Sequence, residues 1–253
     1  MGRVLAMDES GNTQAICGFC LISIPSKELP RIGEILSVAE TDPPEIKTLY
    51  SKVCHGEFKY SAFRQAFRNT GLDVYDQYLR KKLHDLSQLR LQLYYSVFLN
   101  ASGEAQRHAR LHDEASFLIH IWAHENQQDA LDRTLRITVD QQVFSEPMIF
   151  DYFQRRGQSR VVLISKAQLE KGLNSGVLQK VPADRRNTLV VEAVNSRSYK
   201  RIQLSDMLIG CIRERYAQDV ADYYEILKPL VSKQRSRVQI KEYTPPTMQR
   251  FVV

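Results

Sequence analysis

The sequence has 253 residues, of which 43% are hydrophobic and 25% are charged, and its formal net charge is +6. This length allows one large domain or two small ones, and either can bury a core. No apolar stretch approaches the ~20 residues that a membrane span needs, and the N-terminus lacks the apolar region of a signal peptide. Four cysteines in a chain this long do not suggest a disulfide scaffold. We therefore expect a cytoplasmic protein with no membrane partner.

The first half of the chain predicts strands on either side of a helical stretch. We predict strands at residues 3–8, 15–24 and 91–99, a helix at residues 27–40, and a helical pattern at residues 61–87 that is broken near residues 69–71. A turn at 11–13 joins the first two strands into a hairpin, and Pro43 and Pro44 interrupt the helical pattern. Residues 45–60 have no clear pattern. Residues 25–90 therefore form a helical insertion between strands of a sheet.

The second half of the chain alternates between strands and helices. We predict strands at residues 134–139, 160–164 and 188–194, and helices at residues 104–128, 146–156 and 203–226. Residues 233–253 are basic and are expected to be a tail or an edge segment. This order of elements predicts a single α/β domain at residues 1–232, with a mixed sheet flanked by helices.

The basic residues lie mostly in the second half of the chain. Residues 1–130 hold 14 basic and 16 acidic side chains, whereas residues 131–253 hold 21 basic and 13 acidic ones. A basic region favours a polyanion such as DNA or RNA as a partner, although a solvated surface explains the same charges.

Three aspartates lie at the ends or beginnings of predicted elements. Asp8 follows the first apolar strand, Asp140 follows the strand at 134–139, and Asp206 lies one turn into the last long helix. If the two strands are neighbours, the carboxylates converge at one edge of the sheet. Clustered carboxylates repel one another, and they are typical ligands of Mg²⁺ or Mn²⁺. Each aspartate taken alone is also explained as an ordinary turn or helix-start residue.

Two further patterns carry weaker signals. Two pairs of histidines have the i, i+4 spacing of some zinc ligands: His108 with His112, and His120 with His124. We interpret them as a mixture of surface and half-buried side chains. Cys17 and Cys20 have redox spacing, but they lie in an apolar strand, where residues three apart face opposite sides.

The acidic segments resemble a known family. The resemblance is carried by Met7–Gly11, Asp140 at the end of an apolar strand, Ser196, and Gln203–Gly210. Together these segments resemble the family called domain of unknown function 3800, a branch of the ribonuclease H-like superfamily. The resemblance spans residues 3 to about 217, with a divergent middle. It implies a ribonuclease H-like mixed sheet and a metal site with Asp8, Asp140 and Asp206 as ligands.

The superfamily usually has a fourth acid at such a site. We assign it to Glu57, because the family tends to place a glutamate near a lysine there, and Lys59 follows. Glu9 and Glu192 are the alternatives. An extended strand would point Glu9 away from Asp8, which counts against Glu9.

These observations predict a metal-dependent nuclease. Two Mg²⁺ or Mn²⁺ ions held by carboxylates can activate water for phosphodiester cleavage. Residues expected to contact the substrate are Lys59, Arg197, Lys200, Arg201 and Gln203. Gly210 is expected to let the last long helix pack closely on the sheet. The alternatives are a catalytically inert module that binds nucleic acid or a protein partner, and a metal-dependent phosphatase.

Overall fold

The structure is a computed structural model of the chain, and it describes residues 2–11, 15–100, 103–144, 146–155, 158–165, 167, 180–218 and 222–240. Within these residues the strands form one mixed sheet of eight strands, in the order β6-β5-β7-β4-β1-β2-β3-β8. The strands are β1 (Arg3–Ser10), β2 (Ile16–Pro25), β3 (Gln92–Leu99), β4 (Arg136–Asp140), β5 (Met148–Arg155), β6 (Gln158–Ile164), β7 (Arg186–Val194) and β8 (Ser236–Gln239). The prediction of an α/β fold with a mixed sheet flanked by helices is therefore confirmed at this level.

Strand β1 lies in the middle of the sheet and sets the position of the first two aspartates. It pairs antiparallel with β2 and parallel with β4, with Met7 opposite Val139 in the parallel register. The next residues along these two strands are Asp8 and Asp140. Because β1 and β4 run in the same direction, both aspartates reach the same end of the sheet.

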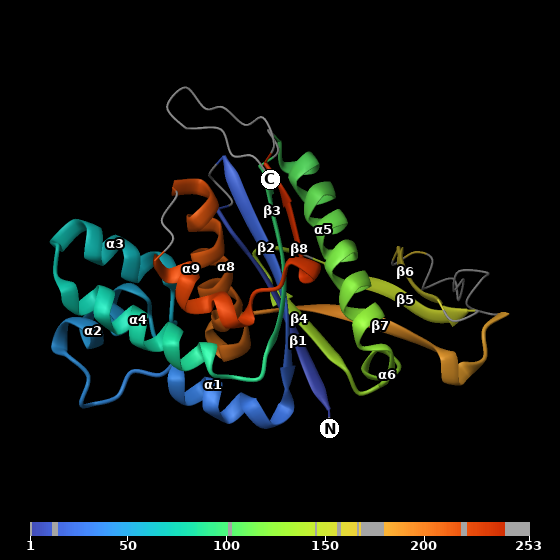
Figure 1. Cartoon of the computed structure of the whole chain (residues 1–253), viewed down its shortest axis with the longest axis horizontal. Helices are drawn as coiled ribbons and strands as arrows, with labels where there is room; N and C mark the ends of the chain where they lie inside the picture. The colour runs from blue at the N-terminus through green and yellow to red at the C-terminus, as the bar shows by residue number, and fades with distance from the viewer. Residues whose placement is uncertain are drawn as a thin grey trace.

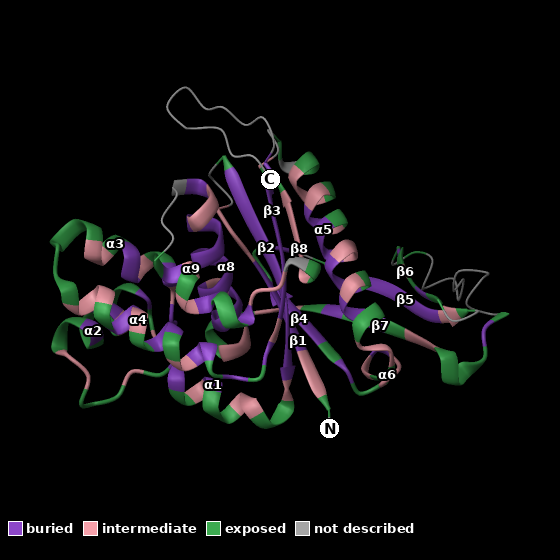
Figure 2. Ribbon diagram, in the orientation of Figure 1, coloured by how far each residue is buried: buried purple, intermediate pink, exposed green. Residues whose placement is uncertain are grey.

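Helices cover both faces of this sheet (Figure 1). On one face lie α1 (Leu29–Ile35), α2 (Pro44–Thr48), α3 (Tyr60–Thr70), α4 (Asp73–Ser87), α8 (Lys200–Gln218) and α9 (Asp222–Leu227). On the other face lie α5 (Glu104–Glu125) and the short α6 (Gln127–Ala130). The central strands and the inward sides of α5 and α8 are buried, and the outer side of α5 is exposed (Figure 2).

Alternation along the strands decides which face the aspartates point to. Leu5 and Met7 pack in the core beneath α5, whereas Ala6 packs in the core beneath α8. Residues two apart in a strand share a face, so Asp8 points toward α8. The same argument applies to β4, where Ile137 and Val139 pack beneath α5 and Asp140 falls on the α8 side.

Several element boundaries differ from the sequence-based predictions. The predicted helix at 146–156 is wrong, because Met148–Arg155 form strand β5 between β6 and β7. Its residues Met148, Phe150 and Tyr152 alternate in the core under α5, and the aromatic side chains favour a strand. The last long helix begins at Lys200 rather than at 203, and it is followed by the separate helix α9.

The C-terminal region contributes an edge strand. Residues Ser236–Gln239 form β8, which pairs parallel with β3. Residues 241–253 lie outside the described residues, and so do residues 12 and 13 of the predicted turn. Across the described part of the chain, no helix is long and apolar enough to cross a membrane.

Candidate metal and nucleic-acid site

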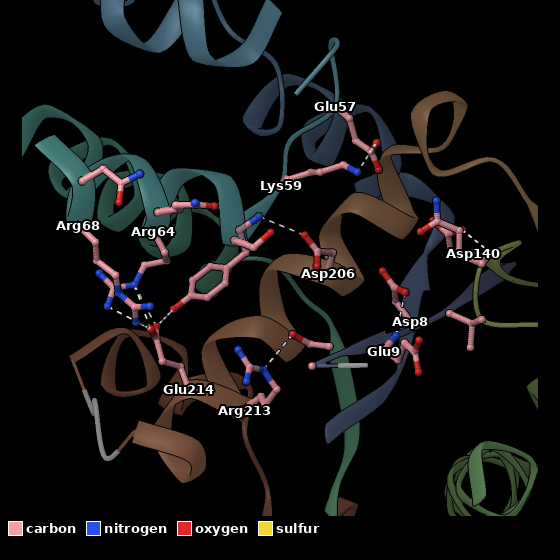
Figure 3. A pocket seen from close by; sticks show the side chains of 18 residues that line it. Asp8, Glu9, Glu57, Lys59, Arg64, Arg68, Asp140, Asp206, Arg213 and Glu214 are labelled. Atoms are coloured by element: carbon pink, nitrogen blue, oxygen red, sulfur yellow. Dashed lines mark hydrogen bonds and ion pairs between the residues drawn. The ribbon is translucent and has the colours of Figure 1, made fainter. Parts of the chain in front are cut away.

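Four acids from distant parts of the sequence line one cavity of about 600 Å³ (Figure 3). Asp8 comes from β1, Asp140 from the end of β4, and Asp206 from α8. Glu57 lies in the segment that leads into α3. The side chains of Asp8, Glu57 and Asp140 are buried, with less than a tenth of their surface exposed.

Backbone amides orient the three aspartates. The N–H of Glu9 donates to Oδ1 of Asp8, and the N–H of Gln142 donates to Oδ1 of Asp140, each at 2.8 Å. The N–H of Tyr60 donates to Oδ2 of Asp206 at 3.1 Å. Tyr60 is the first residue of α3, so the amide end of that helix faces the Asp206 carboxylate.

Glu57 belongs to the same cavity and has a cationic neighbour. Its Oε2 lies 3.3 Å from Nζ of Lys59, whose side chain is 45% exposed. The adjacent N–H of Phe58 donates to Oε1 of the buried Gln203 at 3.0 Å. This bond ties the segment that carries Glu57 to α8, and so places Glu57 near Asp206.

Asp8 and Asp206 carry an electrostatic penalty in their ionised forms. Burial raises the pKa of Asp8 well above its ordinary value, and the charges of Asp206 and Asp140 raise it further. Burial also raises the pKa of Asp206 to about 6, although the Tyr60 amide and Lys59 oppose that shift. Desolvation and like charges both disfavour the ionised forms, and a bound cation would relieve both effects.

In their present orientations, the side chains of the four acids do not form a complete set of metal ligands. Among the described residues, no group of three or more histidine, cysteine, aspartate or glutamate side chains could hold a metal ion. The three aspartates each use one oxygen for the backbone bonds described above. Carboxylate oxygens suit a hard divalent cation, but as these side chains lie, no three of them surround one position.

Three arginines, Arg64, Arg68 and Arg213, line the other end of the cavity (Figure 3). The carboxylate of Glu214 is almost fully buried, and Nε of Arg64 donates to it at 3.0 Å. Arg68 and the hydroxyl of Tyr60 also donate to Glu214. Nε of Arg213 donates to Oγ of Ser10 at 3.2 Å on the β1 side. The cavity is therefore acidic at one end and carries several arginines at the other.

Two glycines permit the close packing that holds this arrangement. A Cβ on Gly210 would lie 2.5 Å from Cδ1 of Tyr60, and a Cβ on Gly18 would lie 2.9 Å from Cδ1 of Ile209. We expected Gly210 to allow α8 to approach the sheet. The structure instead places Gly210 against α3, and Gly18 of β2 allows the approach of α8.

Of the five residues expected to contact substrate, only Lys59 lines the cavity. The amide of Gln203 is fully buried and donates to the backbone oxygen of Ser196. Nζ of Lys200 donates to Gln203 and to the hydroxyl of Tyr50, at 3.1 and 3.0 Å. Nε of Arg201 donates to Oγ1 of Thr138 at 2.9 Å.

Of the fifth of these residues and the two alternative acids, only Glu9 lines the cavity. Arg197 is exposed and does not line the cavity, and neither does Glu192 on β7. Glu9 borders the cavity, but its carboxylate forms an ion pair with Arg107 of α5. Glu9 therefore lies beside Asp8, which its backbone N–H binds, but its carboxylate is held by Arg107, whereas the carboxylate of Glu57 lines the cavity beside Lys59.

The weaker sequence signals do not produce a second site. Cys17 and Cys20 are buried in the cores on opposite faces of the sheet, which confirms the expectation for a strand. Burial raises the pKa of the Cys17 thiol to about 12, so the thiolate is disfavoured. Burial also lowers the pKa of His112 and His120. In the described ranges these histidines are not part of any metal-binding group.

Most residues at the basic end of the cavity were not predicted from the sequence. Its α3 residues Tyr60, Arg64 and Arg68 are spaced i, i+4, i+8, so they follow one face of a helix. Asp206, Gly210 and Glu214 have the same spacing on α8. These two series were visible in the sequence, but their mutual contact depends on the docking of α3 on α8.

Comparison with known proteins adds no assignment. No protein-family model matches the sequence, and a search of curated proteins found no significant match.

Proposed function

We propose that the protein is a metal-dependent nuclease of the ribonuclease H-like type, which hydrolyses phosphodiester bonds of DNA or RNA. The observation that carries the proposal is the cavity lined by Asp8, Glu57, Asp140 and Asp206. Four carboxylates from separate elements are costly to place together, and a divalent cation is the usual compensation. The mixed sheet with helices on both faces also supports this assignment.

The proposed ligands are the carboxylates of these four acids. Bound Mg²⁺ or Mn²⁺ would supply Lewis-acid stabilisation of the transferring phosphoryl group and lower the pKa of the attacking water. The backbone amides of Glu9, Gln142 and Tyr60 orient the carboxylates. Lys59 is positioned to contact a phosphate oxygen, since half of its side chain is exposed beside Glu57.

The test measures metal binding and cleavage separately. Titration calorimetry with MnCl₂ is expected to show binding that Asp206→Asn weakens by about tenfold or more. With Mn²⁺ or Mg²⁺, the protein is expected to cleave labelled single-stranded, duplex or hybrid oligonucleotides, and Asp206→Asn is expected to abolish cleavage. Asp113→Asn is the matched control, because Asp113 is an exposed residue of α5 that does not line the cavity.

The same experiment separates the alternatives. A binding module would retain oligonucleotides without cleaving them, with or without Asp206. A phosphatase would release phosphate from small monoesters and leave internal phosphodiester bonds intact. The nuclease proposal fails if no nucleic acid is cleaved in the presence of either metal.

A further inference from the structure

The wall of the cavity formed by α3 presents a polar surface to the acids. Ser61, Gln65, Arg68 and Asn69 line the cavity from this helix, at spacings that place them on one side of it. Gln65 and Asn69 are exposed, and the side chain of Arg68 is 48% exposed. This wall offers amide donors next to a guanidinium, which is the donor set used to hold a phosphate.

Three arginines line this end of the cavity beside the buried carboxylate of Glu214. Arg64 binds Glu214 through Nε and also donates to the hydroxyl of Tyr223 at 2.9 Å, and it is itself buried. Arg68 and Arg213 add two further positive charges among the residues that line this end.

Glu214 also fixes the position of Arg68. The carboxylate receives donors from Arg64, Arg68 and Tyr60, all of which come from α3. An arginine held in one orientation loses less conformational freedom when it binds an anion. The half-exposed guanidinium of Arg68 is therefore oriented in advance for binding an anion in the cavity.

We propose that Arg68, together with Gln65 and Asn69, binds a second phosphate of the nucleic-acid strand whose scissile phosphate lies at the four acids. This inference rests on the proposed function, because it takes the strand as the ligand of the cavity. In this arrangement α3, which belongs to the helical insertion at residues 25–90, holds the nucleic-acid strand next to the four acids. A phosphodiester with only one phosphate cannot use this subsite.

The first test measures binding without turnover. Fluorescein-labelled 12-nucleotide single-stranded DNA and RNA are titrated with the Asp206→Asn protein in Mg²⁺, at several KCl concentrations. Adding Arg68→Gln is expected to weaken binding about tenfold, the effect of losing one charged hydrogen-bonded contact. The slope of log affinity against log salt is expected to fall by about 0.7, the value for one phosphate contact on a single strand.

The matched control is Arg31→Gln on the same background. Arg31 is an exposed arginine of helix α1 that does not line the cavity, so the same charge is removed elsewhere. Equal affinities and equal salt slopes for the Arg68 and Arg31 variants would overturn the proposal. Absence of any oligonucleotide binding by the parent protein would also overturn it.

The second test uses turnover to exclude an indirect effect through Glu214, Tyr60 and Asp206. Arg68→Gln in the otherwise unchanged protein is expected to lower kcat/KM for the oligonucleotide about tenfold, chiefly through KM. The kcat/KM for bis(p-nitrophenyl) phosphate with Mn²⁺ is expected to stay unchanged. An equal loss for both substrates would contradict the subsite. If neither substrate is cleaved, the nuclease proposal fails, while the binding test still decides the subsite.

Discussion

The backbone N–H of Tyr60 donates to Oδ2 of Asp206 at 3.1 Å, and the hydroxyl of the same tyrosine donates to Glu214. One residue of α3 thus contacts α8 at two carboxylates that lie two turns apart. The ring of Tyr60 packs over Gly210 between them. The acidic end and the basic end of the cavity are therefore joined through a single side chain and its amide.

Replacement of Tyr60 by phenylalanine separates these two contacts. The change removes the hydroxyl donor from the buried Glu214 but leaves the backbone bond to Asp206. The free energy of unfolding is expected to fall by about 1–2 kcal/mol, as measured by urea denaturation, because a buried charged acceptor loses a donor. Metal affinity is expected to change little. An unchanged stability would contradict the role given to the hydroxyl.

Replacement of Gly210 by alanine tests the close approach of α3 to α8. The added Cβ would lie 2.5 Å from Cδ1 and 2.9 Å from Cγ of the Tyr60 ring. Overpacking is expected to cost about 1–3 kcal/mol of unfolding free energy, which exceeds the gain of about 1 kcal/mol in helix propensity.

Gly33 in α1 is the control for this change, because a Cβ there would meet nothing within 4 Å. Gly33→Ala is expected to stabilise the protein by about 0.5–1 kcal/mol through helix propensity alone. Equal effects of the two substitutions would show that Gly210 is not in a tight contact.

The raised pKa of Asp206 predicts a pH dependence of stability in protein freed of divalent ions. Its pKa is raised to about 6, so the folded state binds more protons than the unfolded state between about pH 4 and pH 6. Stability from this group is therefore present at the acidic end of that window and is lost as pH rises through it. Thermal unfolding in EDTA is expected to show this loss in the parent protein and a smaller one in Asp206→Asn. Identical pH profiles of stability for the two proteins would show that Asp206 does not contribute to this pH dependence.

Replacement of Asp8 by asparagine should have opposite effects on stability and on metal binding. Burial and the charges of Asp206 and Asp140 raise the pKa of Asp8, so the ionised carboxylate is unfavourable. Without divalent ions, Asp8→Asn is expected to raise Tm by about 2–4 °C, which corresponds to about 1 kcal/mol. With Mn²⁺, its calorimetric affinity is expected to fall by about tenfold or more. A variant that loses stability in EDTA would indicate that Asp8 has a structural role.

The sequence predicted the parts of the fold that depend on local pattern. Strands β1 and β2 are apolar runs bounded by polar residues, and their pairing follows from the short connection between them. Strand β5 was mistaken for a helix because Met148–Arg155 form a short, nearly continuous apolar and aromatic run, which has no decisive periodicity.

The site was harder to predict because it depends on tertiary contacts. Asp8 and Asp140 could be named because each directly follows a short apolar run in the sequence. Lys200 and Gln203 are near Asp206 in the sequence, but the helix turns them toward Tyr50 and Phe58 and away from the cavity. Arg68 lies far from every aspartate in the sequence, and only the docking of α3 on α8 brings it to the cavity.

Anomalous diffraction from crystals soaked in MnCl₂ tests most directly whether the clustered carboxylates bind a divalent ion. An anomalous peak is expected in the cavity, with oxygen ligands from Asp8, Asp140 and Asp206 at distances of about 2.0–2.3 Å. Manganese bound only elsewhere, or a cavity without a peak at saturating Mn²⁺, would contradict this expectation.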